Sequence, residues 1–264
     1  MNGHTAALFR VPALSLRFYP VWRRNLLVWR KLAAPSMLGN LADPMIYMLG
    51  LGYGLGRLLP EIDGMPYITF LAAGTVCFST MNSATFETLY SAFSRMHVQR
   101  TWDAILNAPV TLDDVVAAEL AWAASKSMLS GLAIMIVVWA LGLAASPLSL
   151  AALLVVPLIG LTFGALGLAV TAVSPSFDFF MYYFTLFITP MAMLSGVFFP
   201  LGELPAGFQV AAWMLPLSHA VALVRPLLLG NVPADIPLHL LVLAAYALAG
   251  FYAALVLFRR RLLS

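Results

Sequence analysis

Five ionisable side chains lie inside or at the edges of long apolar stretches: Asp43, Glu87, Glu119, Lys126 and Asp178. Ionisable groups are costly in the hydrocarbon core of a bilayer, so each is a candidate for function by default. They could form a structural ion pair facing a helix bundle, the polar mouth of a translocation path, or a proton relay. A relay is disfavoured because one lysine and two shallow glutamates make a poor chain across a membrane.

Polar side chains recur at helical spacing in two of these stretches, around Glu87 and around Glu119 and Lys126. If the two helices pack as neighbours, both carboxylates lie at similar depth, and Lys126 could reach either of them. Aromatic residues are frequent in another apolar stretch, 177–199. Their rings could stack on sugars or form an interfacial belt. The candidate path residues are Thr80, Ser83, Glu87, Glu119, Lys126, Tyr182 and Tyr183.

Motifs for bond chemistry are missing from the sequence. It contains neither a phosphate-binding GxxxxGK[ST] loop nor a GxSxG motif, and Cys77 is its single cysteine. Its histidines are scattered, without HExxH spacing, at His4, His97, His219 and His239. We therefore expect no catalytic site, no metal site and no cofactor in this chain.

Composition identifies the environment of these residues. The chain has 264 residues, of which 62% are hydrophobic and 9% charged, whereas soluble domains average about 25% charged residues. Residues 127–177, 179–202 and 236–258 contain no Asp, Glu, Lys or Arg. A membrane span needs roughly 20 apolar residues, and these runs do not alternate as barrel strands do. The sequence predicts an all-α membrane protein.

We expect six transmembrane helices, near residues 36–57, 66–90, 115–142, 148–173, 177–199 and 237–258. Eleven Lys and Arg residues then fall on one side, before the first span, between the second and third, and after the sixth. Only Arg57 and Arg225 fall on the other side. The positive-inside rule places both termini in the cytoplasm, and the modest net charge of +3 indicates orientation rather than nucleic-acid binding.

The segments outside the spans also carry patterns. In the N-terminal segment 1–35, residues 20–31 place Trp and Leu on one helical face and Arg and Lys on the opposite face, as an interfacial amphipathic helix does; a plain basic tail is the alternative. Residues 200–236 are apolar but interrupted by prolines, which favours short re-entrant helices on the periplasmic side over a seventh span.

Two acidic residues near span ends have local alternatives. Asp43 and Pro44 could begin a short first span, as N-cap and first helical residue, or lie inside a longer kinked helix. Asp178 begins the fifth span, where a helix-capping role is favoured.

Four stretches carry a family resemblance: residues 41–56 (LADPMIYMLGLGYGLG), 67–74 (YITFLAAG), 100–111 (RTWDAILNAPVT) and 195–205 (SGVFFPLGELP). With them, nearly the whole chain, 36–264 as the membrane domain, resembles the ABC-2 type exporter permeases. The resemblance is closest to the nodulation protein J family, permeases of lipo-chito-oligosaccharide exporters.

The resemblance implies a homodimer of permeases above a dimer of cytoplasmic ATPases, which bind ATP and Mg²⁺. It implies a coupling helix at residues 95–106 that docks into the ATPase, where Trp102, Ile105 and Leu106 would supply anchors. The full set of expected contact residues is Arg95, Arg100, Thr101, Trp102, Asp103, Ile105 and Leu106.

The function that follows is ATP-driven outward movement of a lipid-linked or lipid-modified oligosaccharide across the bacterial inner membrane. One alternative keeps the class but changes the amphipathic glycolipid-like cargo to drugs, lipids or other polysaccharides. The other is an ion-coupled secondary transporter or an intramembrane enzyme. A secondary transporter should show an inverted internal repeat, and the sequence shows none.

Overall fold

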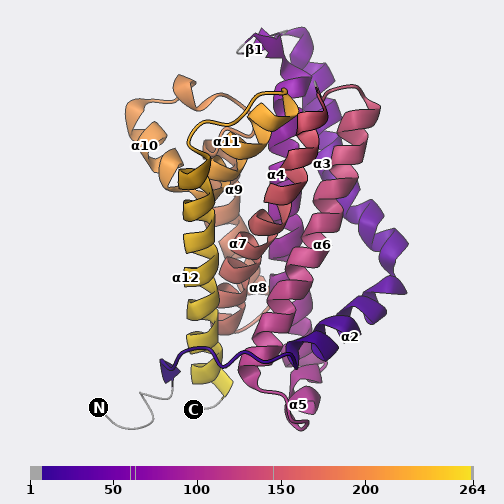
Figure 1. Cartoon of the computed structure of the whole chain (residues 1–264), viewed down its shortest axis with the longest axis vertical. Coiled ribbons are helices and arrows are strands. Elements are labelled where there is room, and N and C mark those ends of the chain that lie inside the picture. The colour runs from indigo at the N-terminus through magenta and orange to yellow at the C-terminus, as the bar shows by residue number, and fades with distance from the viewer. Residues whose placement is uncertain (1–7, 60, 63, 145, 263–264) are drawn as a thin grey trace.

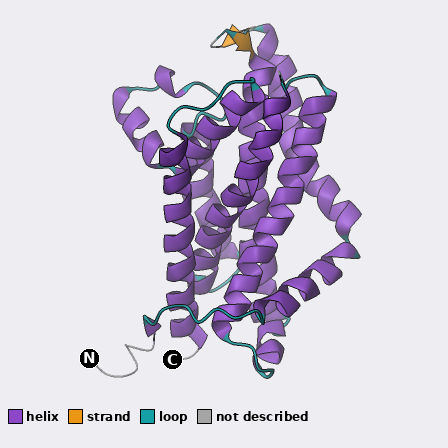
Figure 2. Ribbon diagram, in the orientation of Figure 1, coloured by secondary structure: helices purple, strands orange, loops and turns teal. Residues whose placement is uncertain are grey.

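A computed structural model describes residues 8–59, 61–62, 64–144 and 146–262 of the chain, and within these it omits the side chains of Asn40 and Asp43. The described part is a helical bundle with one short antiparallel hairpin (Figure 2). The helices are α2 (Phe18–Arg30), α3 (Ala33–Gly54), α4 (Tyr67–Phe86), α5 (Thr101–Leu106), α6 (Leu112–Ala140), α7 (Ala152–Val173), α8 (Asp178–Tyr183), α9 (Thr189–Leu194), α10 (Ala206–Met214), α11 (Pro216–Leu228) and α12 (Ile236–Leu262). The strands are β1 (Glu61–Ile62) and β2 (Met65–Pro66). Short 3-10 turns span Leu55–Arg57, Pro147–Ala151 and Leu201–Glu203, and π-helical segments span Glu87–Ala92, Ser94–Val98 and Phe184–Ile188.

Helix α7 lies at the centre of the bundle, where it packs against α4, α6, α11 and α12 (Figure 1). Glycines allow this close approach. A Cβ on Gly160 would collide with Ser127 Oγ of α6, and a Cβ on Gly167 would collide with Thr88 Oγ1 at the end of α4. Small residues at helix interfaces are typical of membrane bundles, because packing rather than a hydrophobic driving force holds such helices together.

Among the described residues, three helices are long and apolar enough to cross a membrane: α6, the stretch Pro147–Val173 that contains α7, and α12. The apolar stretch Asp178–Leu194 is shorter, and α10 and α11 meet at an angle of 89°. Helices also occupy the predicted first and second spans, as α3 and α4. The helical class is therefore confirmed, whereas the count of six crossings and the re-entrant depth of α10 and α11 stay predictions.

Two local alternatives from the sequence are decided. Helix α3 runs without interruption from Ala33 to Gly54, with Pro44 inside it, so the longer first helix is present. The capping role expected of Asp178 was wrong. Asp178 is the first residue inside α8, whose N-cap is Phe177, and that end of the helix has no side-chain cap hydrogen bond. Its carboxylate instead lies in the first turn, where the helix dipole favours negative charge.

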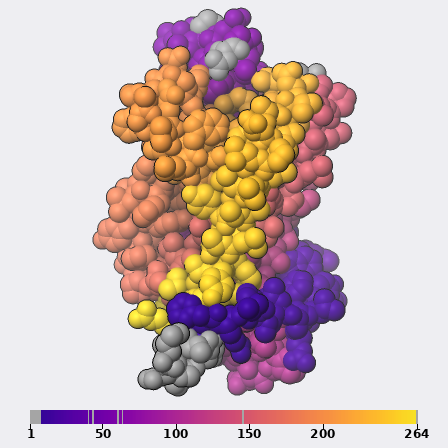
Figure 3. All heavy atoms as spheres, turned by 60° about the vertical axis from the view of Figure 1, so that its left-hand side comes forward, coloured from indigo at the N-terminus to yellow at the C-terminus, as the bar shows by residue number. Residues whose placement is uncertain are grey.

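The two ends of the described chain lie at the same end of the bundle (Figure 1). Arg259 Nη1, near the end of α12, donates to the carbonyl oxygens of Leu8 and Arg10, at 3.0 and 2.7 Å. Tyr252 donates its hydroxyl to the Phe9 carbonyl at 3.0 Å. In Figure 3 the N-terminal segment, in indigo, lies across the end of α12, in yellow. This arrangement agrees with an even number of crossings. Of the predicted N-terminal segment 1–35, residues 1–7 lie outside the described part.

Helix α2 lies across this same end of the molecule. Its apolar face contacts α6, because Trp22 Nε1 donates to Ser125 Oγ at 3.1 Å and the Trp29 ring meets the Trp122 ring edge-on at 5.8 Å. The predicted helix at 20–31 is thus present. Arg24 departs from the exposed basic face that we expected, since it is half-buried and lines a cavity.

Candidate functional site

Three of the five ionisable residues that the sequence singled out, Glu87, Glu119 and Lys126, meet between α6 and the segments that follow α4. Arg95 Nη2 lies 2.8 Å from Glu87 Oε1 and 2.5 Å from Glu119 Oε2, and Arg95 Nε donates to Glu119 Oε1 at 3.0 Å. Lys126 Nζ lies 2.8 Å from Glu87 Oε2. Glu87 and Arg95 sit on the π-helical segments that continue α4, and π-helical turns are frequent at functional sites.

Two buried tryptophans complete the coordination of the carboxylates. Trp122 Nε1 donates to Glu87 Oε1 at 2.8 Å, and Trp102 Nε1 donates to Glu119 Oε1 at 3.1 Å. Sequence reasoning missed both indole donors, because spacing along one helix does not show what a neighbouring helix presents. We call this set the ion network: Glu87, Arg95, Trp102, Glu119, Trp122 and Lys126.

The ion network is neutral in sum and is shielded from solvent. Its two carboxylates face two cations, and the side chains of Glu87 and Glu119 are 3% and 1% exposed. Buried charges persist when they are paired and hydrogen-bonded, and removing one partner of such a pair costs about 3–5 kcal/mol. The pairing fits the structural ion pair among the alternatives. That these residues line a transport path stays a prediction.

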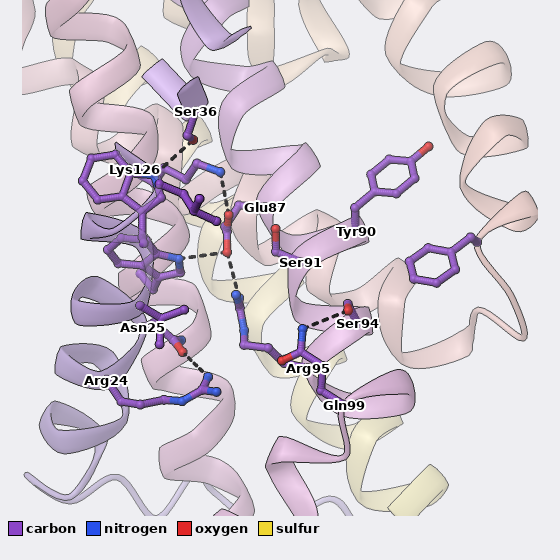
Figure 4. A pocket seen from close by; sticks show the side chains of 15 residues that line it. Arg24, Asn25, Ser36, Glu87, Tyr90, Ser91, Ser94, Arg95, Gln99 and Lys126 are labelled. Carbon is purple, nitrogen blue, oxygen red and sulfur yellow. Dashed lines mark hydrogen bonds and ion pairs between the residues drawn. The ribbon is translucent and has the colours of Figure 1, made fainter. Parts of the chain in front are cut away.

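A cavity of about 510 Å³ opens beside the ion network, between α2, the π-helical segments that follow α4, and α6 (Figure 4). Arg24 and Asn25 of α2 line it opposite Arg95 and Lys126. The walls are mixed in character, with indole, phenol and aliphatic groups beside the polar ones. The apolar and aromatic lining residues are Val28, Trp29, Leu32, Tyr90, Trp122 and Phe177.

The remaining predicted path residues do not join this cavity. Thr80 is buried and donates its hydroxyl to the Val76 carbonyl at 2.8 Å, and Ser83 is buried with its hydroxyl unpartnered among the described residues. Tyr182 points away from the core, with 65% of its surface exposed, whereas Tyr183 is half-buried. The structure therefore gathers Glu87, Glu119 and Lys126 but leaves the other four separate.

Helix α5 corresponds to the core of the predicted coupling helix, yet its tryptophan does not face outward. Trp102 is fully buried, and its ring lies 5.0 Å from that of Phe258. Ile105 and Leu106 are half-buried, and Arg95 belongs to the ion network. An exposed Trp102 anchor was thus a wrong expectation, because the indole is used to attach α5 to its own chain. Within 95–106 the exposed residues are His97, Val98, Gln99, Arg100, Asp103 and Ala104.

A second buried ion pair escaped the sequence analysis. Arg259 Nη2 lies 2.6 Å from Asp113 Oδ2, with side chains 1% and 0% exposed. Asp113 also accepts the Ala13 amide at 2.9 Å, and Asp114 accepts the Ser15 amide at 2.7 Å. From the sequence, Arg259 indicates only the orientation of the chain in the membrane. The Thr111-x-x-Asp114 capping box marks the start of α6, the helix that carries Asp113.

Two of the histidines that look scattered in the sequence meet in space. His219 Nδ1 lies 2.8 Å from His239 Nδ1, and His219 Nε2 lies 2.8 Å from the Trp213 carbonyl oxygen. A carbonyl can only accept, so His219 carries a proton on Nε2; in its neutral form His219 Nδ1 then accepts from His239 Nδ1. His4 lies outside the described residues. Within the described ranges, no group of three or more His, Cys, Asp or Glu side chains could hold a metal ion.

Residues 17–229, which include α2 through α11 and the whole ion network, match the family model described as ABC-2 type transporter. The chain belongs to the ABC-2 type transporter family. Among curated proteins, this permease is 47% identical to nodulation protein J of Rhizobium meliloti (strain 1021) over 96% of its own length and 97% of the relative's. It is 49% identical to nodulation protein J of Rhizobium leguminosarum bv. viciae over 96% and 98% of the two chains.

Membership of the family has consequences for the structure. An ABC-2 permease is a multi-pass membrane protein, which agrees with the apolar helices of the bundle. The family also implies a separate ATPase subunit, and its transmembrane subunits are typically non-catalytic. The resemblance to nodulation protein J is confirmed along nearly the full chain.

Proposed function

We propose that this ABC-2 permease is the membrane subunit of an ATP-driven exporter that moves a lipid-modified oligosaccharide outward across the inner membrane. Two copies assemble with two ATPase subunits, and the permease itself performs no bond chemistry. The near full-length similarity to several nodulation protein J sequences supports the exporter class, and the cargo follows from the family resemblance.

The observation that carries the mechanism is the attachment of α5 to the ion network. One edge of α5 is held inside the chain by Trp102, which bonds Glu119 of α6; Arg95 then connects Glu119 to Glu87 at the end of α4. The opposite edge, at Asp103 and Ala104, is exposed. A force on that exposed edge is therefore transmitted to α4 and α6 through buried, charge-assisted contacts, which are stronger than neutral hydrogen bonds.

The proposed topology has six crossings, formed by α3, α4, α6, the stretch that contains α7, the pair α8 and α9, and α12. The end of the molecule with both chain ends and α5 faces the cytoplasm. Most basic residues cluster there, as the positive-inside rule requires. Placing α5 on this side gives the ATPase access to it.

Co-purification with the ATPase tests the coupling assignment. Ala104→Trp and Asp103→Arg alter exposed positions of α5 and leave Trp102 in place, so the permease should fold as wild type does. We expect both variants to lose most of the bound ATPase, because a small interface depends on a few central contacts. Leu262→Trp, an exposed change at the same end of the molecule, is the matched control. Full retention of the ATPase by both α5 variants would refute the assignment.

A further inference from the structure

The cavity between α2, α4 and α6 contains more hydrogen-bond donors than the chain itself uses. Asn25 is 3% exposed, and its amide nitrogen Nδ2 has no partner among the described residues. The other amide atom, Oδ1, accepts a hydrogen bond from Arg24 Nη1 at 3.0 Å. Nδ2 is therefore the amide atom that has no partner among the described residues. A buried donor without an acceptor costs about 1–3 kcal/mol, which favours a ligand that accepts from it.

Arg24 adds a positive charge that the described part of the chain does not neutralise. Its hydrogen bonds go to neutral oxygens, Asn25 Oδ1 and, at 3.5 Å, Thr101 Oγ1, and no described carboxylate forms a salt bridge with it. Burial lowers the pKa of Arg24 from its usual value, and the Arg95 cation lowers it further, while Glu119 opposes both effects. Glu119 is thus the anion nearest in effect, but its carboxylate is already held by Arg95.

The other charges around the cavity cancel one another. Glu87 is the acidic residue of the lining, and both its oxygens already accept from cations, Oε1 from Arg95 and Oε2 from Lys126. Glu119 is likewise held by Arg95. The surplus charge at the cavity is thus the one on Arg24, and the Asn25 amide adds a buried donor without a partner among the described residues.

The apolar wall limits the kind of anion that fits. Val28 follows Arg24 one turn along α2, Leu32 lies just before α3, and Trp29 and Trp122 line the same cavity. Val28 is half exposed, so the apolar side of the cavity reaches the outer surface of the bundle. A small hydrated ion would leave this wall unused, whereas an anionic headgroup with an attached acyl chain uses both parts.

We propose that this cavity binds a phosphate-type anionic lipid headgroup, with Arg24 and the Asn25 amide as its donors. The acyl chain lies along Val28 and Leu32. The headgroup belongs either to a membrane phospholipid or to an anionic amphipathic cargo, and the phosphate-type chemistry is common to both. The site adjoins the coupling stretch, because Arg24 contacts Thr101 of α5 and Arg95 lines the cavity, but neither Arg24 nor Asn25 lies on α5 itself.

Quenching of tryptophan fluorescence by brominated lipids tests the site, because Trp29 and Trp122 line the cavity. The purified full-length permease in a nonionic detergent, without ATPase, is titrated with brominated phosphatidylglycerol and with brominated phosphatidylcholine. We expect saturable quenching by the anionic lipid at concentrations at least tenfold lower than by the zwitterionic one. Equal affinity for the two lipids would overturn the proposal.

Variants connect the signal to the named donors. Arg24→Gln should weaken binding of phosphatidylglycerol about tenfold, the loss expected for one charge-assisted hydrogen bond, while Arg24→Lys keeps the charge and most of the affinity. Asn25→Asp should abolish binding, because a carboxylate there pairs with Arg24 and repels the headgroup. Arg23→Gln, on the exposed face of α2, is the matched control. Wild-type affinity in Arg24→Gln or Asn25→Asp would refute the site.

Competition separates recognition of the phosphate group from recognition of the acyl chain. If inorganic phosphate displaces the brominated lipid at millimolar concentrations, the site recognises the phosphate group alone; if it does not, the acyl chain is part of the recognition. Both results support an anion site, whereas lipid binding that persists unchanged in Asn25→Asp does not. Because the ATPase is absent, failure here leaves the exporter assignment standing, and failure of ATPase co-purification leaves this site standing.

Discussion

Replacing Arg95 by Met removes the cation that both buried carboxylates share. Glu119 then keeps only the Trp102 indole as a partner, at 3.1 Å, while Glu87 keeps Lys126 and Trp122. Glu119 is 1% exposed, so it becomes a buried charge without a counter-ion. Breaking a buried pair in this way costs about 3–5 kcal/mol, and we expect a loss of that size in the free energy of unfolding.

Two companion variants separate this mechanism from general damage. Lys126→Met leaves Glu87 bound by Arg95 and Trp122, and Lys126 is 14% exposed, so the expected loss is smaller, about 1–2 kcal/mol. The double change Arg95→Met with Glu119→Gln removes the unpaired charge together with its partner. It should recover at least about 1 kcal/mol of the loss, because neutral replacement of a buried pair is far less costly than breaking it.

The assay is titration of the purified permease from mild detergent into sodium dodecyl sulphate, followed by tryptophan fluorescence and circular dichroism. Wild type, the two single variants and the double variant are compared under identical micelle composition. The reasoning is refuted if Arg95→Met unfolds within 1 kcal/mol of wild type. It is also refuted if the double variant is no more stable than Arg95→Met, because Glu119 would then not carry the penalty.

Three further changes test other contacts. Gly167→Ala places a methyl group against the buried hydroxyl of Thr88, just after α4, and should destabilise the bundle by about 1–3 kcal/mol. Thermal unfolding equal to that of wild type would contradict the packing. Arg259→Met leaves Asp113 unpaired and should expose residues 8–17 to protease, whereas unchanged protection would contradict the attachment. His239→Phe removes the donor to His219 and should cost about 1 kcal/mol; an unaltered nitrogen NMR spectrum of His219 would contradict the assigned tautomer.

Much of the helical layout followed from the sequence because apolar length and charge placement are strong signals in membranes. Helices occupy each stretch predicted to span the membrane, from α3 to α12, and α2 lies at the predicted amphipathic segment. The sharp bend between α10 and α11 agrees with the proline-interrupted stretch before the last helix. These features depend on composition within one segment, which needs no knowledge of its neighbours.

The candidate site was only partly predictable, because it depends on contacts between segments. Helical spacing singled out Glu87, Glu119 and Lys126, and the three residues do meet. Arg95 carried no intramembrane signal, since basic residues near span ends are normally orientation charges. Its long side chain reaches back into the bundle, as such side chains do when they find buried carboxylates.

Trp102 shows why it is difficult to infer from the sequence which side of a short helix faces its own protein. A tryptophan in a loop between spans indicates a binding anchor, but the same ring can equally attach the loop to its own protein. The buried Glu119 acceptor decides between these roles, and it lies in a different helix. Arg24 and Asn25 pose the same difficulty, because the sequence shows a basic helix but not the cavity that two of its polar side chains line.

The central claim is that this permease moves an amphipathic oligosaccharide only when an ATPase acts on it. The most direct measurement uses inside-out vesicles that contain the permease and its co-expressed ATPase, with a labelled lipo-chito-oligosaccharide outside. We predict ATP-dependent accumulation of the label that requires both subunits and is lost in Ala104→Trp. Accumulation driven by an ion gradient in vesicles that contain the permease alone would contradict the account.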